Sequence, residues 1–354
     1  MKAKLISESP KSILLVRLTA RGDVVFSSPM VRALRRTYPD ARISWFGESH
    51  TVGLIEHHPE FHEVFSWERE RWKTLAGKWK WVTLAREVLG LIKALRNQKF
   101  DLAIDMQGLL RSGVMVFLSG ARTRIVLRPK EGSHFFADHV IDRNRDQGNP
   151  WEICSHYRYL AQQLDLDAED FRMEVPLTME DRAFAEQIIQ ENGLGGGYSV
   201  AIPYTTRPQK HWFEDRWATL MDRLKTDFGL PTVILGGPTD EEADGRIRSR
   251  TGSEPVSLVG KTTLRQAAAM IERATLVVGV DTGLTHIGIA FDRPTIGIYG
   301  SNVPYTETFT DQTRILIHWL ECVPCKGHPT CDGDFTCLRL ITVDEVLGVV
   351  REMV

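Results

Sequence analysis

One aspartate near the start of the chain lies where a general base would be useful. Asp23 belongs to RLTARGDVVFSSP, residues 17–29, in which an expected buried strand runs into a Gly-containing loop. Ser28 is expected to cap the helix after that loop, with Pro29 at its first position and its end near Thr37. Ligands of open α/β sheets bind at the carboxyl ends of strands, so the Asp23 carboxylate could accept a proton from a substrate there. The alternative is that Asp23 only caps the following helix.

Two later stretches suit a phosphorylated ligand. YTTRPQKHW, residues 204–212, places the hydroxyls of Thr205 and Thr206 near the cation of Lys210, a combination that binds phosphate oxygens. The alternative is a solvated polar loop. GVDTGLTHIGIAFDRPTIGIYG, residues 279–300, predicts a strand, a turn and a short helix whose first N–H groups bind anions. Asp281 could accept hydrogen bonds from sugar hydroxyls. The turn itself holds Thr282, Gly283, Leu284 and His286.

A third strand-end loop adds a further carboxylate. Asp240 follows an expected strand in LGGPTDEE, residues 235–242, and could bind a ribose hydroxyl. Three such loops on successive strands suit one nucleotide-linked ligand, because the carboxyl ends of parallel strands share one edge of a sheet.

A basic and aromatic segment, WERERWKTLAGKWKW, spans residues 67–81 and holds four of the nine tryptophans. Arg69, Arg71 and Lys73 alternate there with aromatic residues at helical spacing. Amphipathic segments of this kind contact anionic surfaces, including membrane headgroups. The alternative is a surface helix that packs its aromatic face on its own domain.

Four of the five cysteines lie between residues 322 and 337. Their spacing differs from a zinc ribbon, yet short loops would let four thiolates reach one structural zinc ion or one iron–sulfur cluster. The other interpretations are redox pairs and reduced thiols that hold a loop. The candidate ligands are Cys322, Cys325, Cys331 and Cys337, with His328 as a substitute for one of them.

The elements that must position these residues alternate between short apolar runs and amphipathic helices, which predicts an α/β fold with parallel sheets. Expected strands cover residues 13–18, 42–46, 63–67, 100–106, 198–203, 232–235, 276–280 and 295–299. Expected helices include residues 79–97, 109–118, 151–164, 215–228 and 262–274, and a last one that Thr342 and Glu345 begin with a capping box. The pattern weakens between about 172 and 197, where the run NGLGGG suggests a domain junction.

Length and composition narrow the class of protein. The chain has 354 residues, enough for two domains, and its 42% apolar and 25% charged residues are ordinary for a globular protein. A net charge of −2 argues against a nucleic-acid partner. No apolar run is long enough to span a membrane, and the start MKAKLISESPKS does not look like a signal peptide. We therefore expect a cytoplasmic protein.

Taken together, the chain resembles the ADP-heptose:lipopolysaccharide heptosyltransferases of glycosyltransferase family 9. The resemblance rests on ARGDVVFSSP, DMQGLLRSG, TTRPQKHW and VDTGLTHIGIAFDRPTIGIYG. It implies the GT-B fold, two Rossmann-like domains facing a central cleft. Residues 1–180 would bind the acceptor, residues 190–337 would bind the ADP-sugar, and residues 338–354 would form a C-terminal helix. It also implies an inverting reaction that requires no cofactor or catalytic metal.

The resemblance assigns roles residue by residue. Asp23 matches the family's general base. The donor-binding positions are Thr205, Thr206, Lys210, Asp240, Asp281, Thr282, Gly283, Leu284 and His286. The acceptor-binding positions are Arg69, Arg71, Lys73, Gln107 and Arg111.

The resemblance also names the substrates. TTRPQKHW looks most like heptosyltransferase I members, which add the first heptose to a Kdo sugar, whereas similar cysteine-rich tails occur in heptosyltransferase II-like relatives. The implied partners are ADP-heptose, Kdo-lipid A or an already heptosylated core, and the inner face of the inner membrane. The remaining alternatives are a family 9 transferase with another acceptor, a GT-B sugar-nucleotide epimerase, and a non-enzymatic membrane- or glycan-binding module.

Overall fold

The computed structural model describes residues 5–6, 9–142, 149, 151–302, 305–325 and 328–354. The start of the chain, on which the expectation of a missing signal peptide rests, lies partly outside these described residues. The chain divides into two compact units. Unit 1 comprises Met1–Pro150 and Cys154–Pro176, and unit 2 comprises Trp151–Ile153 and Leu177–Val354.

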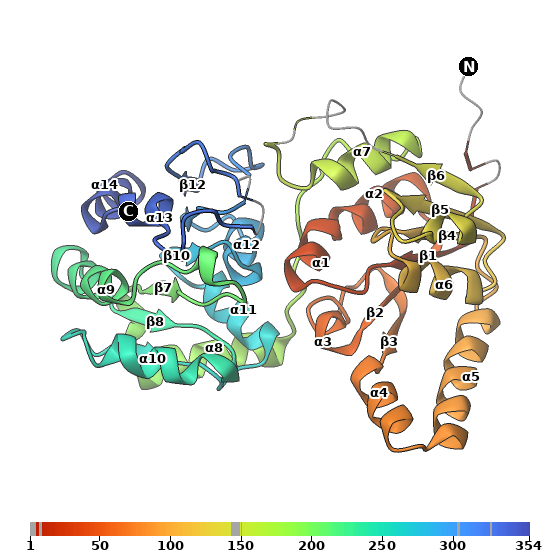
Figure 1. The fold of residues 1–354 in the computed structure, drawn as a ribbon, viewed down its shortest axis with the longest axis horizontal. Coiled ribbons are helices and arrows are strands. Elements are labelled where there is room, and N and C mark those ends of the chain that lie inside the picture. The colour runs from red at the N-terminus through yellow and green to blue at the C-terminus, as the bar shows by residue number, and fades with distance from the viewer. Residues whose placement is uncertain (1–4, 7–8, 143–148, 150, 303–304, 326–327) are drawn as a thin grey trace. The chain divides into compact units, whose positions relative to one another are not determined.

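Unit 1 contains a six-stranded parallel sheet in the order β3-β2-β1-β4-β5-β6 (Figure 1). Its strands are β1 (Ser12–Val16), β2 (Arg42–Glu48), β3 (Phe61–Trp67), β4 (Leu102–Asp105), β5 (Thr123–Leu127) and β6 (His139–Ile141). Its helices are α1 (Arg21–Ser27), α2 (Pro29–Thr37), α3 (Ser49–Val52), α4 (Arg69–Gly77), α5 (Trp81–Asn97), α6 (Leu110–Leu118), η1 (Ser133–Phe136) and α7 (Ser155–Gln163). The central strand β1 is buried along its whole length, as expected for a strand covered on both faces.

Unit 2 contains a second six-stranded parallel sheet in the order β12-β11-β10-β7-β8-β9. Its strands are β7 (Ser199–Ile202), β8 (Thr232–Ile234), β9 (Val256–Ser257), β10 (Leu276–Val280), β11 (Thr295–Ile298) and β12 (Thr313–Leu316). Its helices are α8 (Met179–Glu191), η2 (Leu194–Gly196), η3 (Pro208–Lys210), α9 (Glu214–Phe228), η4 (Pro238–Asp240), α10 (Glu241–Arg248), α11 (Leu264–Glu272), α12 (Gly283–Ala290), α13 (Thr336–Leu340) and α14 (Val343–Met353).

Both sheets repeat one topology. In each unit the first strand pairs with the second strand on one side and the fourth on the other, so the strand order reverses beside the first strand. This reversal lies between β1 and β4 in unit 1 and between β7 and β10 in unit 2. Loops that leave the carboxyl ends of strands at such a point diverge and leave room for a ligand. The α/β fold predicted from the sequence is confirmed.

Several local expectations were wrong. The helix expected from Pro29 to about Thr37 is present as α2, with Ser28 at its N-cap position, but the Ser28 hydroxyl does not cap it because it donates to the carbonyl of Val25 at 2.7 Å. Residues 21–27, expected as part of a loop, form the additional helix α1. The helix expected from residue 79 begins at Trp81, because the backbone of Trp79 is left-handed, with φ 56. The helix expected over residues 151–164 begins only at Ser155.

Unit 2 shows one missed helix and one confirmed helix start. Helix α8 fills residues whose pattern had seemed weak, and Thr178 caps it by accepting from the N–H of Asp181. Thr342 caps α14 as expected, because its hydroxyl accepts from the N–H of Glu345 at 3.1 Å. Among the described residues, no helix has the length and apolar character needed to cross a lipid bilayer.

Candidate functional site

The carboxyl ends of β1, β2 and β4 bring most of the predicted unit 1 residues to one edge of the sheet. The three strands are parallel neighbours, so the segments that follow them lie side by side. Asp23 follows β1, Glu48 ends β2, and Gln107 and Arg111 follow β4. This edge is therefore where unit 1 could hold a ligand.

Asp23 lies in the first turn of α1, not in a loop as the sequence suggested. Its Oδ2 accepts a hydrogen bond from the N–H of Ala20 at 3.3 Å and forms an ion pair with the guanidinium of Arg17. Arg17 is largely buried, whereas 41% of the Asp23 side chain is exposed. Asp23 thus caps its helix and at the same time offers an accessible carboxylate, so the two interpretations of this residue are compatible.

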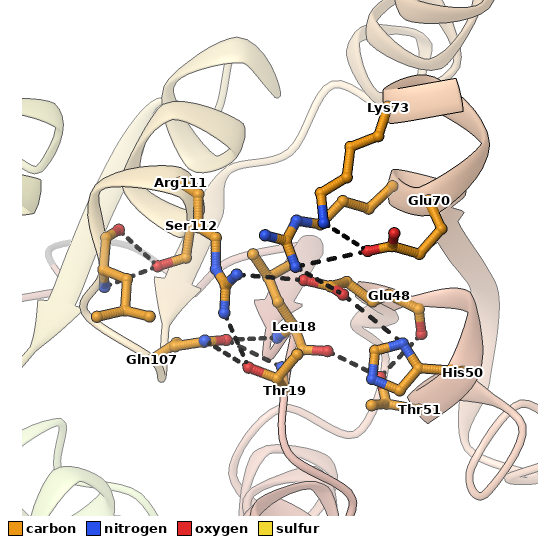
Figure 2. A network of polar contacts seen from close by, with 12 residues as sticks. Leu18, Thr19, Glu48, His50, Thr51, Glu70, Lys73, Gln107, Arg111 and Ser112 are labelled. Atoms are coloured by element: carbon orange, nitrogen blue, oxygen red, sulfur yellow. Dashed lines mark hydrogen bonds and ion pairs between the residues drawn. The ribbon is translucent and has the colours of Figure 1, made fainter. Parts of the chain in front are cut away.

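Glu48 is a buried carboxylate surrounded by cations, and the sequence analysis missed it. Only 3% of its side chain is exposed. Its Oε2 lies 3.8 Å from Arg69 Nη1 and 3.6 Å from His50 Nδ1, and its Oε1 lies 3.6 Å from Arg111 Nη1 (Figure 2). Arg69 comes from α4 and Arg111 from α6, so Glu48 holds together two arginines that are far apart in the chain. Only its place at the end of a strand could have drawn attention to it.

Gln107 holds the segment after β1 in place. Its Oε1 accepts from the N–H groups of Leu18 at 2.7 Å and Thr19 at 3.1 Å, and its Nε2 donates to the Thr19 hydroxyl at 3.0 Å (Figure 2). Arg111 Nη2 donates to the same hydroxyl at 3.1 Å. The amide of Gln107 is therefore engaged within the protein, and its geometry suits positioning more than direct contact with a ligand.

Asp105 holds the turn after β4 that carries Gln107. Its Oδ1 accepts from the N–H groups of Gln107 and Gly108, and its Oδ2 accepts from the Ser112 hydroxyl at 2.8 Å. Burial raises the pKa of this carboxyl, although these hydrogen bonds oppose the shift. Gly108 has φ +72, and a Cβ there would lie 2.5 Å from the carbonyl oxygen of Leu127, so the turn requires glycine.

The three predicted acceptor cations of α4 have different surroundings. Arg69 faces Glu48, as described above. Lys73 pairs with Glu70 at 2.8 Å, and Glu70 also lies 3.9 Å from Arg69, so Lys73 adjoins the same network (Figure 2). Arg71 instead pairs with Glu87 of α5 at 2.6 Å. The structure thus brings Arg69 and Arg111 together but directs Arg71 toward the neighbouring helix.

An open groove of about 560 Å³ adjoins Arg111. It is mostly apolar and is lined by Trp67, Leu109, Leu110, Arg111, Val114, Met115 and Glu131. Within the described residues, Arg111 Nε and Glu48 Oε1 are buried without a hydrogen-bond partner. Buried polar atoms normally find partners, so this corner has unused capacity for a polar ligand group.

Asp281 is the centre of the candidate site in unit 2. Its Oδ2 lies 2.5 Å from Lys210 Nζ and accepts from Asn302 Nδ2 at 2.6 Å, and its Oδ1 lies 3.6 Å from His286 Nε2. Burial would raise the pKa of the Asp281 carboxyl, but His286 and Lys210 together hold that pKa well below its ordinary value. Asp281 is therefore ionised at neutral pH, and it offsets part of the Lys210 charge.

Lys210 reaches Asp281 because β7 and β10 are adjacent. The loop after β7 passes Thr205 and the exposed Thr206 and enters the short helix η3, which ends at Lys210. His211 fixes this loop, since its Nε2 lies 2.8 Å from the carbonyl oxygen of Thr205. The structure thus places two hydroxyl residues and one ammonium group beside the loop that follows β10.

The start of α12 supplies N–H groups beside Asp281. Thr282 is extended, with φ −148, and its side chain does not cap the helix, so no capping side chain among the described residues covers the first N–H groups of Gly283 and Leu284, which can face an anion. The Thr285 hydroxyl donates to the carbonyl of Val280 at 2.7 Å and anchors the turn. Gly279 makes room for this, because a Cβ there would lie 2.2 Å from Thr285 Oγ1.

Asp240 has a structural contact of its own. Its Oδ2 accepts from the N–H of Gly237 at 2.8 Å and closes the turn after β8. The strand β8 pairs with β7, so Asp240 belongs to the same sheet edge as Lys210. Contact between Asp240 and a ribose stays a prediction.

The four clustered cysteines converge. Cys322, Cys325, Cys331 and Cys337 line one small cavity of about 20 Å³, together with Gln209 and Ser301. Burial raises the pKa of the Cys337 thiol, and the other three thiols add to the shift. His328 is exposed. In the described part of the chain, no three His, Cys, Asp or Glu side chains are arranged to hold a metal ion.

The chain matches a protein-family model. Residues 88–333 match the model of glycosyltransferase family 9, the heptosyltransferase family. The matched range includes the donor-side residues described above and extends through three of the four clustered cysteines.

Individual relatives and solved structures agree with this family match. The chain is 27% identical over 294 residues to lipopolysaccharide heptosyltransferase 1 of Escherichia coli K12, covering 82% of this chain and 88% of that protein. It is also 27% identical over 325 residues to lipooligosaccharide heptosyltransferase 2 of Haemophilus influenzae, covering 86% and 88%. Among solved structures, the family 9 glycosyltransferase of Veillonella parvula superposes with a TM-score of 0.82 at 20% identity, covering 100% of this chain and 98% of that one. The GT-B fold predicted from the sequence is thereby confirmed.

Proposed function

This chain belongs to glycosyltransferase family 9, and from that membership and the two sites we propose that it transfers heptose from ADP-heptose to the inner core of lipopolysaccharide. The support comes from relatives named as heptosyltransferases 1 and 2, each matched over more than four fifths of the chain. The observation that carries the proposal is that the chain has a candidate general base in unit 1 and a candidate diphosphate site in unit 2. Unit 1 offers an accessible carboxylate beside cations, and unit 2 offers an ammonium group beside open N–H groups.

Asp23 is the proposed general base. The acceptor hydroxyl attacks C1 of the heptose from the face opposite ADP, and the Asp23 carboxylate takes its proton as positive charge develops on the sugar. The ion pair with Arg17 holds the Asp23 side chain in place at the start of α1. The new bond joins the acceptor oxygen to C1, and the bond from C1 to the phosphate oxygen breaks, which inverts the configuration at C1.

The donor diphosphate is assigned to unit 2. Lys210 and the first N–H groups of α12 lie at the same sheet edge and can neutralise the charge that grows on the leaving ADP. Thr205 and Thr206 add hydroxyl donors to the phosphates. Asp281 keeps Lys210 in place and can accept a hydrogen bond from a sugar hydroxyl.

The acceptor is assigned to the unit 1 edge. Kdo carries a carboxylate, which a guanidinium group can bind. Arg111 lines the open groove, and Arg69 shares the Glu48 carboxylate with Arg111. Lys73 adds charge to this network, while Gln107 fixes the loop that precedes Asp23. An enzyme that modifies such a lipid-linked acceptor would work at the inner face of the inner membrane.

The test is a transfer assay with two acceptors. The protein is incubated with ADP-heptose and either Kdo-lipid A or the same lipid carrying one heptose, and product masses are measured. Transfer to the first acceptor would assign the addition of the first heptose, and transfer to the second alone would assign a heptosyltransferase II-like step. Formation of an isomerised ADP-sugar with neither acceptor modified would favour the epimerase alternative.

The clustered thiols are proposed to be structural. Four cysteines around one small cavity are candidates to hold a zinc ion or an iron–sulfur cluster, or to stay reduced. Elemental analysis of anaerobically purified protein distinguishes these states. Cys331→Ser should lower the unfolding temperature more than the turnover at low temperature, and the opposite pattern would place the cluster in the active site.

A further inference from the structure

The connection between α4 and α5 exposes an unusual set of side chains. Residues 77–82, Gly-Lys-Trp-Lys-Trp-Val, form the end of a helical hairpin that extends away from the sheet of unit 1 (Figure 1). All six residues of this hairpin tip are exposed. The exposed fractions are 80% for Trp79, 52% for Trp81 and 75% for Val82. Large apolar side chains that gather on a surface commonly mark an interaction site.

The tryptophans of the tip do not pack in the hydrophobic core. Earlier on the hairpin, Trp72 packs against Trp67 with ring centroids 5.9 Å apart, and Leu75 is buried. Trp79 follows the end of α4 in a left-handed backbone conformation that non-glycine residues seldom adopt. Its indole contacts that of Trp81 edge to face, with centroids 6.1 Å apart. The chain thus turns two indoles outward as a pair.

The hairpin is also strongly basic. Residues 69–97 carry eight basic and two acidic side chains, although the whole chain has a net charge of −2. Both acidic side chains are already paired, Glu70 with Lys73 and Glu87 with Arg71. Within the described residues, neither Lys78 nor Lys80 has a carboxylate in ion-pairing distance, so the charge at the tip is uncompensated.

Helix α5 continues this surface. Val82, Arg86, Leu89 and Lys93 follow one another at helical spacing along one face, and all four are exposed. A helix face that mixes exposed aliphatic and basic residues is typical of helices that lie in the lipid–water interface.

We propose that the hairpin tip docks into the interface of an anionic lipid bilayer, with the indoles of Trp79 and Trp81 at the headgroup level and Lys78 and Lys80 among the lipid phosphates. Indoles favour this depth because one part of the ring is apolar and the N–H is polar. The inference rests on the proposed function, since a lipid-linked acceptor gives the enzyme a reason to reach the bilayer. It goes further by separating the lipid-binding residues from Arg69 and Arg111.

The size of the effect follows from general magnitudes. Each cation near an anionic bilayer strengthens binding about five-fold. Replacing both lysines, in Lys78→Gln/Lys80→Gln, should therefore weaken binding by about 25-fold at low salt. Replacing both indoles, in Trp79→Ser/Trp81→Ser, should weaken it by at least about ten-fold, with little dependence on salt.

The experiment is vesicle flotation with the full chain. The vesicles contain phosphatidylethanolamine and phosphatidylglycerol, and vesicles of phosphatidylcholine alone test the need for negative charge. Trp319→Ser is the matched control, because Trp319 is 51% exposed and meets Trp151 edge to face at 5.7 Å, but lies between His318 and Leu320. The wild type and this control should float with the anionic vesicles, and both tip variants should not.

Activity measurements separate this inference from the proposed function. Both tip variants should lose turnover on the acylated acceptor in vesicles and keep wild-type turnover on the same oligosaccharide without acyl chains. Vesicle binding that is unchanged in Trp79→Ser/Trp81→Ser would overturn the inference, and so would equal losses on both acceptors. A change of oligomeric state in place of vesicle binding would overturn it in favour of a subunit interface. A wild type that floats but transfers no heptose would refute the proposed function alone.

Discussion

Replacing Glu48 by Gln should weaken acceptor binding without affecting the donor. Glu48 is buried, and its carboxylate lies 3.6–3.8 Å from groups of Arg69, Arg111 and His50. Glutamine keeps the size of the side chain and removes the charge that holds the two arginines. They would then repel each other and lose the orientation that a carboxylate ligand requires.

The magnitude follows from these distances. A hydrogen bond to a charged group contributes about 1.5–3 kcal/mol, and contacts beyond 3.5 Å contribute less, so we take about 1–2 kcal/mol. This corresponds to an increase of about 5- to 30-fold in the KM for the acceptor. The turnover at saturating acceptor should change by less, because Asp23 is left in place.

The assay is steady-state transfer with either substrate varied, together with thermal unfolding. Glu87→Gln is the control, since it removes the partner of Arg71 on the same hairpin and leaves the Glu48 cluster intact. We expect an unchanged acceptor KM for this control. A wild-type acceptor KM in Glu48→Gln would refute the positioning role, and so would an equal rise in the donor KM.

Three further predictions concern the proposed catalytic and donor residues. Asp23→Ala should lower turnover by about 10²- to 10⁴-fold at unchanged ADP affinity, measured by single-turnover kinetics and titration. Lys210→Ala should weaken ADP binding by about 10- to 150-fold, because a diphosphate loses a charge-assisted partner, and calorimetric titration that finds equal affinity would place Lys210 elsewhere. The lowered pKa of Asp281 means that its ionised form stabilises the fold above about pH 4, and that this contribution is lost as the pH falls further. In Asp281→Asn, the free energy of unfolding should therefore fall less than in the wild type as the pH drops below about 4. An equally steep fall in the variant would contradict this.

Much of the sheet could be predicted, because buried parallel strands are continuous apolar runs. The run LVVGV was expected as a strand over residues 276–280 and forms β10 with those bounds. The start of α1 could not be predicted in the same way. Its first turn, RGDV, has no apolar periodicity, and the start signal of Ser28 and Pro29 belongs to the next helix, α2. Local sequence signals there favoured a loop that the tertiary structure replaces with a helix.

The candidate site was predictable where single loops define it and not where distant segments meet. Asp281 and Lys210 lie in recognisable strand-end loops, and the adjacency of β7 and β10 brings them together. Glu48 has no motif of its own, because its importance comes from Arg69 and Arg111 on two other elements. The different surroundings of Arg69 and Arg71, two residues apart, depend on which face of α4 meets α5, and the charge pattern alone does not reveal that.

The most direct test of the proposed activity is the mass and configuration of the product that wild-type protein forms from ADP-heptose and Kdo-lipid A, with Asp23→Asn in parallel. Our account predicts that the wild type adds one heptose with inversion at C1 to this acceptor or to its heptosylated form, and that the variant adds far less in the same time. Lipid acceptors that gain no heptose from the wild type, or an Asp23→Asn variant that transfers at the wild-type rate, would contradict it.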